Sequence, residues 1–239
     1  MEVKIYESKA DVAAAFCDFL QGELSQKKMY HIALSGGSTP QGVFDLLATE
    51  KYKDIDWSGV HLYWGDERCV PPTDEQSNYR MTKEHLLSGI DIPAENVHRI
   101  RGEDIPSQEA WRYSRFLEEK LPQANQLPRF DLLMLGMGDD GHTASVFPHQ
   151  MELWDAEEPC VVADHPETGQ NRVSLSGKII NNAAIVAFLV TGANKAEKVE
   201  EILEKKGDYK NYPANRVQPV DGELFWFLDK AAAKGINQD

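Results

Sequence analysis

The chain has 239 residues, of which 41% are hydrophobic and 27% charged, and its formal net charge at pH 7 is −14. This composition is typical of a folded globular enzyme and excludes the disordered and fibrous classes. The negative charge argues against nucleic acid or an anionic membrane as a partner, because phosphate groups would be repelled. No segment reaches the ~20 consecutive apolar residues that a membrane-spanning helix needs.

The three cysteines, Cys17, Cys69 and Cys160, are far apart in the sequence and form no C-x-x-C pair. We expect reduced thiols, and neither a disulfide framework nor a zinc site is favoured. The opening residues, MEVKIYESKADV, lack the basic and apolar regions of a secretory signal, so a cytoplasmic location is expected.

Short apolar runs alternate with helical patterns along nearly the whole chain. This alternation is typical of βαβ units and predicts one α/β domain over residues 1–239, with a mostly parallel, open, Rossmann-like sheet and helices on both faces. The predicted strands are Val3–Tyr6, His31–Ser35, Val60–Trp64, Val97–Ile100, Phe130–Leu135, Cys160–Ala163, Arg172–Leu175 and Ala184–Val190. The predicted helices are Ser8–Gln26, Thr39–Leu47, Asn78–Leu87, Ser107–Lys120, Ala193–Lys206 and Asp221–Ala233.

The loop LSGGSTPQG follows the second predicted strand and leads directly into a helix. Gly36 and Gly37 allow a tight turn, while Ser38, Thr39 and the free amides of the helix start can face an anion. Thr39 is the expected N-cap, because Pro40 suits the first helical position. The loop lacks the Gly-Lys-Ser/Thr ending of a nucleoside triphosphate site, so it predicts either a phosphate cradle or an ordinary strand-to-helix turn.

The segment WGDERCVPPTDEQSNY begins where the third predicted strand ends. Asp66, Glu67 and Arg68 would therefore lie at the carboxyl edge of the sheet, where α/β proteins usually bind ligands. Arg68 could clamp a phosphate, and Asp66 could orient the arginine or a sugar hydroxyl. The alternatives are a charged surface loop and, for Cys69, a reactive thiol, although no histidine lies near it in the sequence.

The segment LLMLGMGDDGHTASVFP contains a G-x-G-x-x-G pattern directly after an apolar strand. A dinucleotide is nevertheless not indicated, because Asp139 and Asp140 would repel its pyrophosphate. We expect the glycines instead to make room for His142, which a neighbouring carboxylate could hold in one tautomer for proton transfer. The alternative is a structural histidine that caps a turn.

Two further basic residues, Arg172 and Lys195, follow in NRVSLS and GANKAE. Both lie near the ends of predicted strands, and in so acidic a chain they form with Arg68 the evident candidate for an anion pocket. Lys195 taken alone could equally be a solvent-exposed lysine.

These segments, in this order, resemble the 6-phosphogluconolactonase family, the enzymes of the second step of the pentose phosphate pathway. SGGSTP, GDERCVPPTDEQSNY and LGMGDDGHTASVFP each resemble a family segment almost throughout, and NRVSLS and GANKAE resemble two weaker ones. The resemblance implies the fold shared with glucosamine-6-phosphate deaminases and isomerases. Thr143–Pro148 departs from the deaminase pattern and follows the lactonase one, whereas Cys69 stands where many lactonases have an aromatic residue.

The resemblance implies hydrolysis of a δ-lactone of a sugar phosphate, with His142 as general base and without a cofactor. The sequence contains no G-x-S-x-G elbow, so a covalent acyl-enzyme is not expected. It also contains no H-E-x-x-H spacing that would complete a metal site. The sequence leaves open which carboxylate orients His142 and whether Arg68 or amides near Gly138–Gly141 stabilise the oxyanion. It also does not decide between a monomer and a homodimer. A deaminase and a sugar-phosphate-binding regulator are the alternative functions. The expected catalytic residues are His142, Asp140, Arg68 and Asp66, and the expected substrate contacts are Gly36, Gly37, Ser38, Thr39, Arg68, Arg172 and Lys195.

Overall fold

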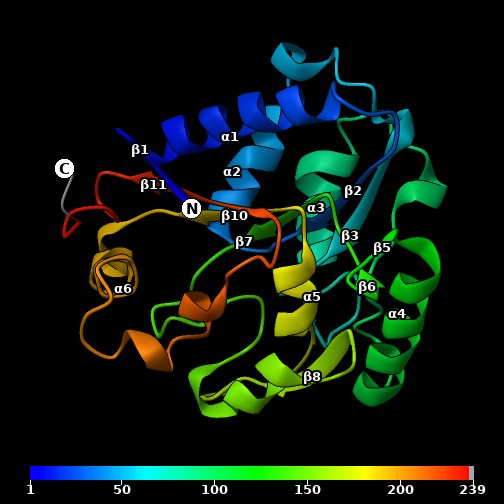
Figure 1. Ribbon diagram of the computed structural model, residues 1–239. Coiled ribbons are helices and arrows are strands. Elements are labelled where there is room, and N and C mark those ends of the chain that lie inside the picture. Colours follow the sequence, from blue (N-terminus) through cyan, green and yellow to red (C-terminus); the bar gives the residue numbers. More distant parts are fainter. Residues whose placement is uncertain (237–239) are drawn as a thin grey trace.

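The computed structural model describes residues 1–236, which form a six-stranded sheet with helices on both sides (Figure 1). Every strand pairs in parallel with its neighbours, in the order β1-β11-β10-β7-β2-β3. The predicted α/β fold with a mostly parallel sheet is therefore confirmed. The strands are β1 (Glu2–Tyr6), β2 (Tyr30–Leu34), β3 (Val60–Trp64), β7 (Leu132–Leu135), β10 (Ile185–Val190) and β11 (Glu223–Asp229).

Helices α1 (Lys9–Leu24) and α2 (Ser38–Leu47) lie above the sheet in Figure 1, and α5 (Gly177–Asn182) and α6 (Ala196–Leu203) lie below it. Helix α1 begins as expected, because the Ser8 side chain accepts a hydrogen bond from the Asp11 amide. The other helices are α3 (Asn78–Thr82), a π-helical turn at Lys83–Leu87, α4 (Pro106–Lys120), and 3₁₀ segments at Glu50–Tyr52, Trp57–Gly59, Ala94–Asn96, Pro148–Asp155, Ala193–Lys195, Tyr209–Asn211 and Pro213–Arg216. None of the helices in residues 1–236 is long and apolar enough to cross a membrane.

The middle of the sheet is covered on both faces, so its strands consist of buried residues throughout. All residues of β2, β7 and β10 are buried. Phe188 and Trp226 stack across neighbouring strands with their ring centroids 4.0 Å apart. The loops at the carboxyl ends of the strands start from this closely packed centre.

A second, antiparallel sheet joins segments that are about a hundred residues apart in sequence. Its strands are β4 (Asp66–Arg68), β9 (Asn171–Leu175) and β8 (Cys160–Asp164), in the order β4-β9-β8. Arg68 pairs with Arg172 in this register. A short hairpin of β5 (Gln123–Ala124) and β6 (Leu127–Pro128) completes the strands of the described residues.

Two predicted elements were wrong. Residues Asp221–Ala233 were expected to be helical, but they contain β11, which lies between β1 and β10. The run ELFWFLD is apolar on both faces and rich in aromatic residues, which suits a covered strand better than an amphipathic helix. Val97–Ile100 forms only a single bridge, from Val97 to Leu62, instead of a strand.

The helix predicted at Ala193–Lys206 begins with a 3₁₀ turn and is α-helical only from Ala196 to Leu203. The helix predicted at Asn78–Leu87 becomes π-helical from Lys83. The region Asp66–Arg68, predicted as loop, is a short strand.

Three histidine rings stack near the start of β2 and β3, at the edge opposite the strands' carboxyl ends. The ring centroids of His31 and His61 are 5.1 Å apart, and those of His61 and His98 are 5.3 Å apart. His61 Nδ1 and His98 Nε2 share a hydrogen bond of 3.0 Å, and His31 Nδ1 lies 3.2 Å from the Tyr63 hydroxyl. Burial lowers the pKa of both His31 and His98 to about 4.

Stability should therefore fall in weak acid. Because the pKa values of His31 and His98 lie below the ordinary 6.5, the unfolded chain binds more protons than the folded chain between pH 6.5 and about 4. The contribution of these neutral rings is present above pH 6.5 and is lost as the pH falls. In His98→Gln, urea unfolding followed by circular dichroism should show a shallower loss, while the exposed His149→Gln should follow the wild type. An equally steep loss in His98→Gln would contradict this assignment.

Candidate active site

A cavity of about 130 Å³ lies at the carboxyl ends of β2, β3 and β7, the edge of an open α/β sheet where ligands bind. It is small and polar, and the side chains around it come from five different segments of the chain. Its walls are Ser35, Gly36, Asp66, Arg68, Asn78, Gly136, Met137, Gly138, His142, Ala144 and Arg172.

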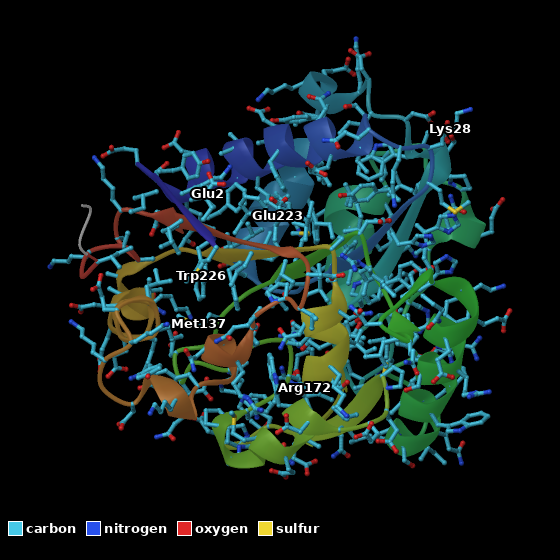
Figure 2. All side chains as sticks on the ribbon, in the orientation of Figure 1. Glu2, Lys28, Met137, Arg172, Glu223 and Trp226 are labelled. Atoms are coloured by element: carbon cyan, nitrogen blue, oxygen red, sulfur yellow. The ribbon has the colours of Figure 1, made fainter. Side chains whose placement is uncertain are left out.

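Two guanidinium groups face this cavity from neighbouring strands. Arg68 in β4 pairs with Arg172 in β9, so two like charges stand opposite each other. Arg172 and Met137 both lie below the six-stranded sheet in the side-chain view (Figure 2). The Nε atoms of Arg68 and Arg172 are buried, and neither has a hydrogen-bond partner in the described part of the chain. Burial, with the charge of Arg68, lowers the pKa of Arg172. An anion bound between them would supply the missing acceptor and relieve the repulsion.

His142 lies beside this arginine pair and is held by Asp140. The His142 Nδ1 and Asp140 Oδ1 atoms are 2.6 Å apart, and the same oxygen accepts the His142 amide at 3.0 Å. Although burial acts to raise the pKa of Asp140, the bond and charge of His142 outweigh it and lower the pKa to about 2. An ionised Asp140 fixes the neutral imidazole with its proton on Nδ1, which leaves Nε2 free to accept one.

The glycines of this loop make room for the histidine. A Cβ atom on Gly138 would overlap the His142 ring and the Asp140 carboxylate. Gly141 has a φ of +82°, a conformation that side chains rarely adopt. The Gly138 amide donates to the His142 carbonyl and the Gly141 amide to the Gly138 carbonyl, which closes the loop on itself.

Asp66, the other carboxylate considered for orienting His142, is bonded elsewhere. Its Oδ2 accepts the Ser145 hydroxyl at 2.6 Å, and its Oδ1 accepts the Asn78 side-chain amide at 3.2 Å. Asp66 therefore ties the loop after β7 to the start of α3, and it is Asp140 that contacts His142.

Glu67 and Asn78 contribute to the site although the sequence assigned them no role there. Glu67 is 2% exposed, and its carboxylate accepts the amides of Arg68, Asn78 and Tyr79 together with the Ser77 hydroxyl. Burial raises its pKa. It thereby caps α3 and fixes the backbone that carries Arg68 and Asn78. The only signals in the sequence were that Glu67 is an acidic residue at the end of a predicted strand and that SNY, further along, opens a predicted helix.

Helix α2, which follows the predicted phosphate loop, has a different N-cap from the predicted one. The N-cap is Gly37, with a φ of +105°, and not Thr39. The Thr39 hydroxyl instead bonds the Thr191 hydroxyl at 2.8 Å, across to the end of β10. Gly37 and Ser38 line an adjoining cavity of about 320 Å³, which Arg68 and Asn78 also border. The glycine is needed at the cap because the chain turns there with a positive φ.

Lys195 lies apart from the walls of the smaller cavity. Its ammonium is paired with the Asp139 carboxylate, which also accepts the Asn194 side-chain amide at 2.9 Å. Cys69 is half-buried, and burial raises its pKa to about 11, which disfavours a reactive thiolate. Among residues 1–236, no three histidine, cysteine or carboxylate side chains are grouped closely enough to hold a metal ion.

A parallel α/β sheet carries an arginine pair, a histidine–aspartate pair and a helix start at its carboxyl edge, which is the combination expected of an enzyme that acts on a small anionic ligand. The chain belongs to the family of glucosamine-6-phosphate isomerases and 6-phosphogluconolactonases, because the model of this family matches residues 6–226. The family assignment from the sequence is thus confirmed.

Individual relatives agree with this family. The 6-phosphogluconolactonase of Treponema pallidum (strain Nichols) is 45% identical over 202 residues, which is 84% of this chain and 84% of that protein. A solved structure described as devB protein is 42% identical, with a TM-score of 0.94, and covers 99% of both chains. The structure of 6-phosphogluconolactonase from Trypanosoma brucei is 30% identical, with a TM-score of 0.87 over 99% of this chain and 98% of that one.

The arginine pair predicts stabilisation by a divalent anion. Sulfate should raise the melting temperature more than chloride at equal ionic strength, because it binds the folded state between Arg68 and Arg172. Arg172→Gln should lose most of this difference, whereas Arg115→Gln, a variant at an exposed arginine of α4 that pairs with Glu118, should keep it. Since sulfate also stabilises proteins generally, the difference between the variants is the measurement. An equal rise in both would contradict an anion site here.

Proposed function

We propose that this chain hydrolyses 6-phospho-D-glucono-1,5-lactone to 6-phospho-D-gluconate in the oxidative pentose phosphate pathway. The observation that carries the proposal is that His142, with Nδ1 bonded to Asp140, shares one cavity with Arg68 and Arg172. Attack of water on an activated ester needs a general base, which a single imidazole supplies, and a positive charge that stabilises the oxyanion, which the arginines supply. The relatives named 6-phosphogluconolactonase support the same substrate.

In the proposed reaction, His142 Nε2 removes a proton from water while the water oxygen attacks C1 of the lactone. The carbonyl electrons move to the exocyclic oxygen and give a tetrahedral oxyanion. When this intermediate collapses, the bond between C1 and the ring oxygen breaks, and the imidazolium returns its proton to that oxygen. No covalent bond to the protein forms, and ionised Asp140 stabilises the imidazolium between the two steps.

Arg68 is the oxyanion donor that the geometry favours. Of the amides near Gly138–Gly141, which the sequence left as alternatives, those of Gly138 and Gly141 already donate to carbonyl groups within their own loop. Arg68 Nε has no partner in the described chain and belongs to the cavity wall. In this proposal Arg172 supports Arg68 at the lactone end, and Asp66 keeps the two loops together through Ser145.

The phosphate of the substrate is proposed to bind near the start of α2 and Lys195. The bond between Thr39 and Thr191 joins these two segments. In the sheet order β10-β7-β2-β3, the loop with His142 follows β7 and therefore lies between the loop with Lys195, after β10, and the start of α2, after β2. Helix-start amides after Gly37, the Ser38 hydroxyl and the Lys195 ammonium are suitable phosphate donors.

Replacement of the base tests this function. His142→Asn should keep the fold and lower kcat for fresh 6-phosphogluconolactone by about 10²–10⁴, the usual contribution of a general base. The rate is measured by proton release above the spontaneous opening of the lactone. His149→Asn is the matched control, because its ring also lies against Phe147 yet is exposed, and it should leave kcat within about twofold. A His142→Asn enzyme with nearly wild-type kcat would move the base elsewhere.

A further inference from the structure

The ion pair between Asp139 and Lys195 links the loops that follow β7 and β10. The Asp139 side chain is 69% exposed, whereas that of Lys195 is 19% exposed. The same Asp139 oxygen also accepts the Asn194 side-chain amide, at 2.9 Å. The Asp139 side chain is therefore largely accessible to water, whereas the Lys195 side chain is mostly covered by the protein.

The loop that carries Lys195 is hydrogen-bonded to the end of β11. Both carboxylate oxygens of Asp229, at the end of β11, accept the Gly192 amide, at 3.0 and 3.1 Å. Gly192 has a φ of +103°, and the preceding Thr191 is bonded to Thr39 of α2. The loop that carries Lys195 is thus joined to α2 through Thr191, while the partner Asp139 comes from the loop that also carries His142.

We propose that Asp139 is a specificity-determining residue that competes with the substrate phosphate for Lys195. This inference rests on the proposed function. In the free enzyme the carboxylate satisfies the covered ammonium; when the substrate binds, its phosphate takes that ammonium and Asp139 turns to water. The exchange leaves Lys195 paired in both states, so its charge is never left uncompensated.

The competition changes the affinity for phosphorylated ligands in a direction that can be measured. An exposed carboxylate makes a weak ion pair, so a phosphate dianion held also by helix-start amides displaces it. Asp139 nevertheless lowers the affinity for phosphorylated ligands, both by occupying Lys195 and by repelling the dianion. The same effect speeds release of the phosphorylated product, and it leaves ligands without phosphate untouched.

Calorimetry with Asp139→Asn tests the proposal. The variant should bind 6-phosphogluconate and inorganic phosphate about two- to fivefold more tightly than the wild type, which is the range that loss of an exposed ion pair supports. Binding of gluconate should not change. In parallel, KM for 6-phosphogluconolactone should fall by a similar factor, while kcat/KM for plain gluconolactone stays constant.

Two further variants separate competition from other effects. Glu157→Gln removes the exposed partner of Lys178 and should change none of these values. In a Lys195→Met background, Asp139→Asn should no longer improve phosphate binding by the full factor, because the shared partner is gone. Unchanged or weaker phosphate binding in Asp139→Asn would overturn the proposal and make Asp139 a neutral or supporting residue. If no lactone were hydrolysed but phosphate still bound more tightly, the proposed function would fail while this role of Asp139 stood.

Discussion

The pairing of β4 with β9 places two positive charges together, and the proposed chemistry of the site depends on it. Arg68 and Arg172 stand opposite each other at a half-buried position, where like charges are unfavourable. Asp66 and Glu67, on the same short strand, compensate part of this charge, and both are buried and fully engaged in hydrogen bonds. What remains is a demand for a small anion at one spot beside His142. In the proposed reaction, the lactone carbonyl becomes an oxyanion, and this charge meets that demand most fully in the transition state.

Local signals in the sequence were enough to predict most of the sheet and to bring together the central residues of the candidate site. Buried parallel strands are continuous apolar runs, and glycine-rich loops at their ends limit where ligands can bind. His142 and Asp140 are two residues apart, so their contact needed little beyond the turn that Gly138 and Gly141 permit. The sequence did not decide between Asp140 and Asp66 as the partner, because only the fold directs Asp66 towards Ser145.

Features that depend on distant segments could not be predicted in the same way. The register that opposes Arg68 to Arg172 joins strands about a hundred residues apart, and no periodic pattern marks it. Lys195 was recognised as a cation near a strand end, but its pairing with Asp139 follows from the neighbouring positions of β7 and β10. The strand ELFWFLD cannot be told from a helix in the sequence, because a short apolar run carries no period that separates the two.

The most direct test of the account compares two substrates with the wild-type enzyme. Fresh 6-phosphogluconolactone and glucosamine 6-phosphate are each supplied, and the release of acid and of ammonia is followed. The account predicts acid release from the lactone well above its spontaneous opening and no ammonia from the amino sugar. Ammonia release, with the lactone opening only at its spontaneous rate, would contradict it.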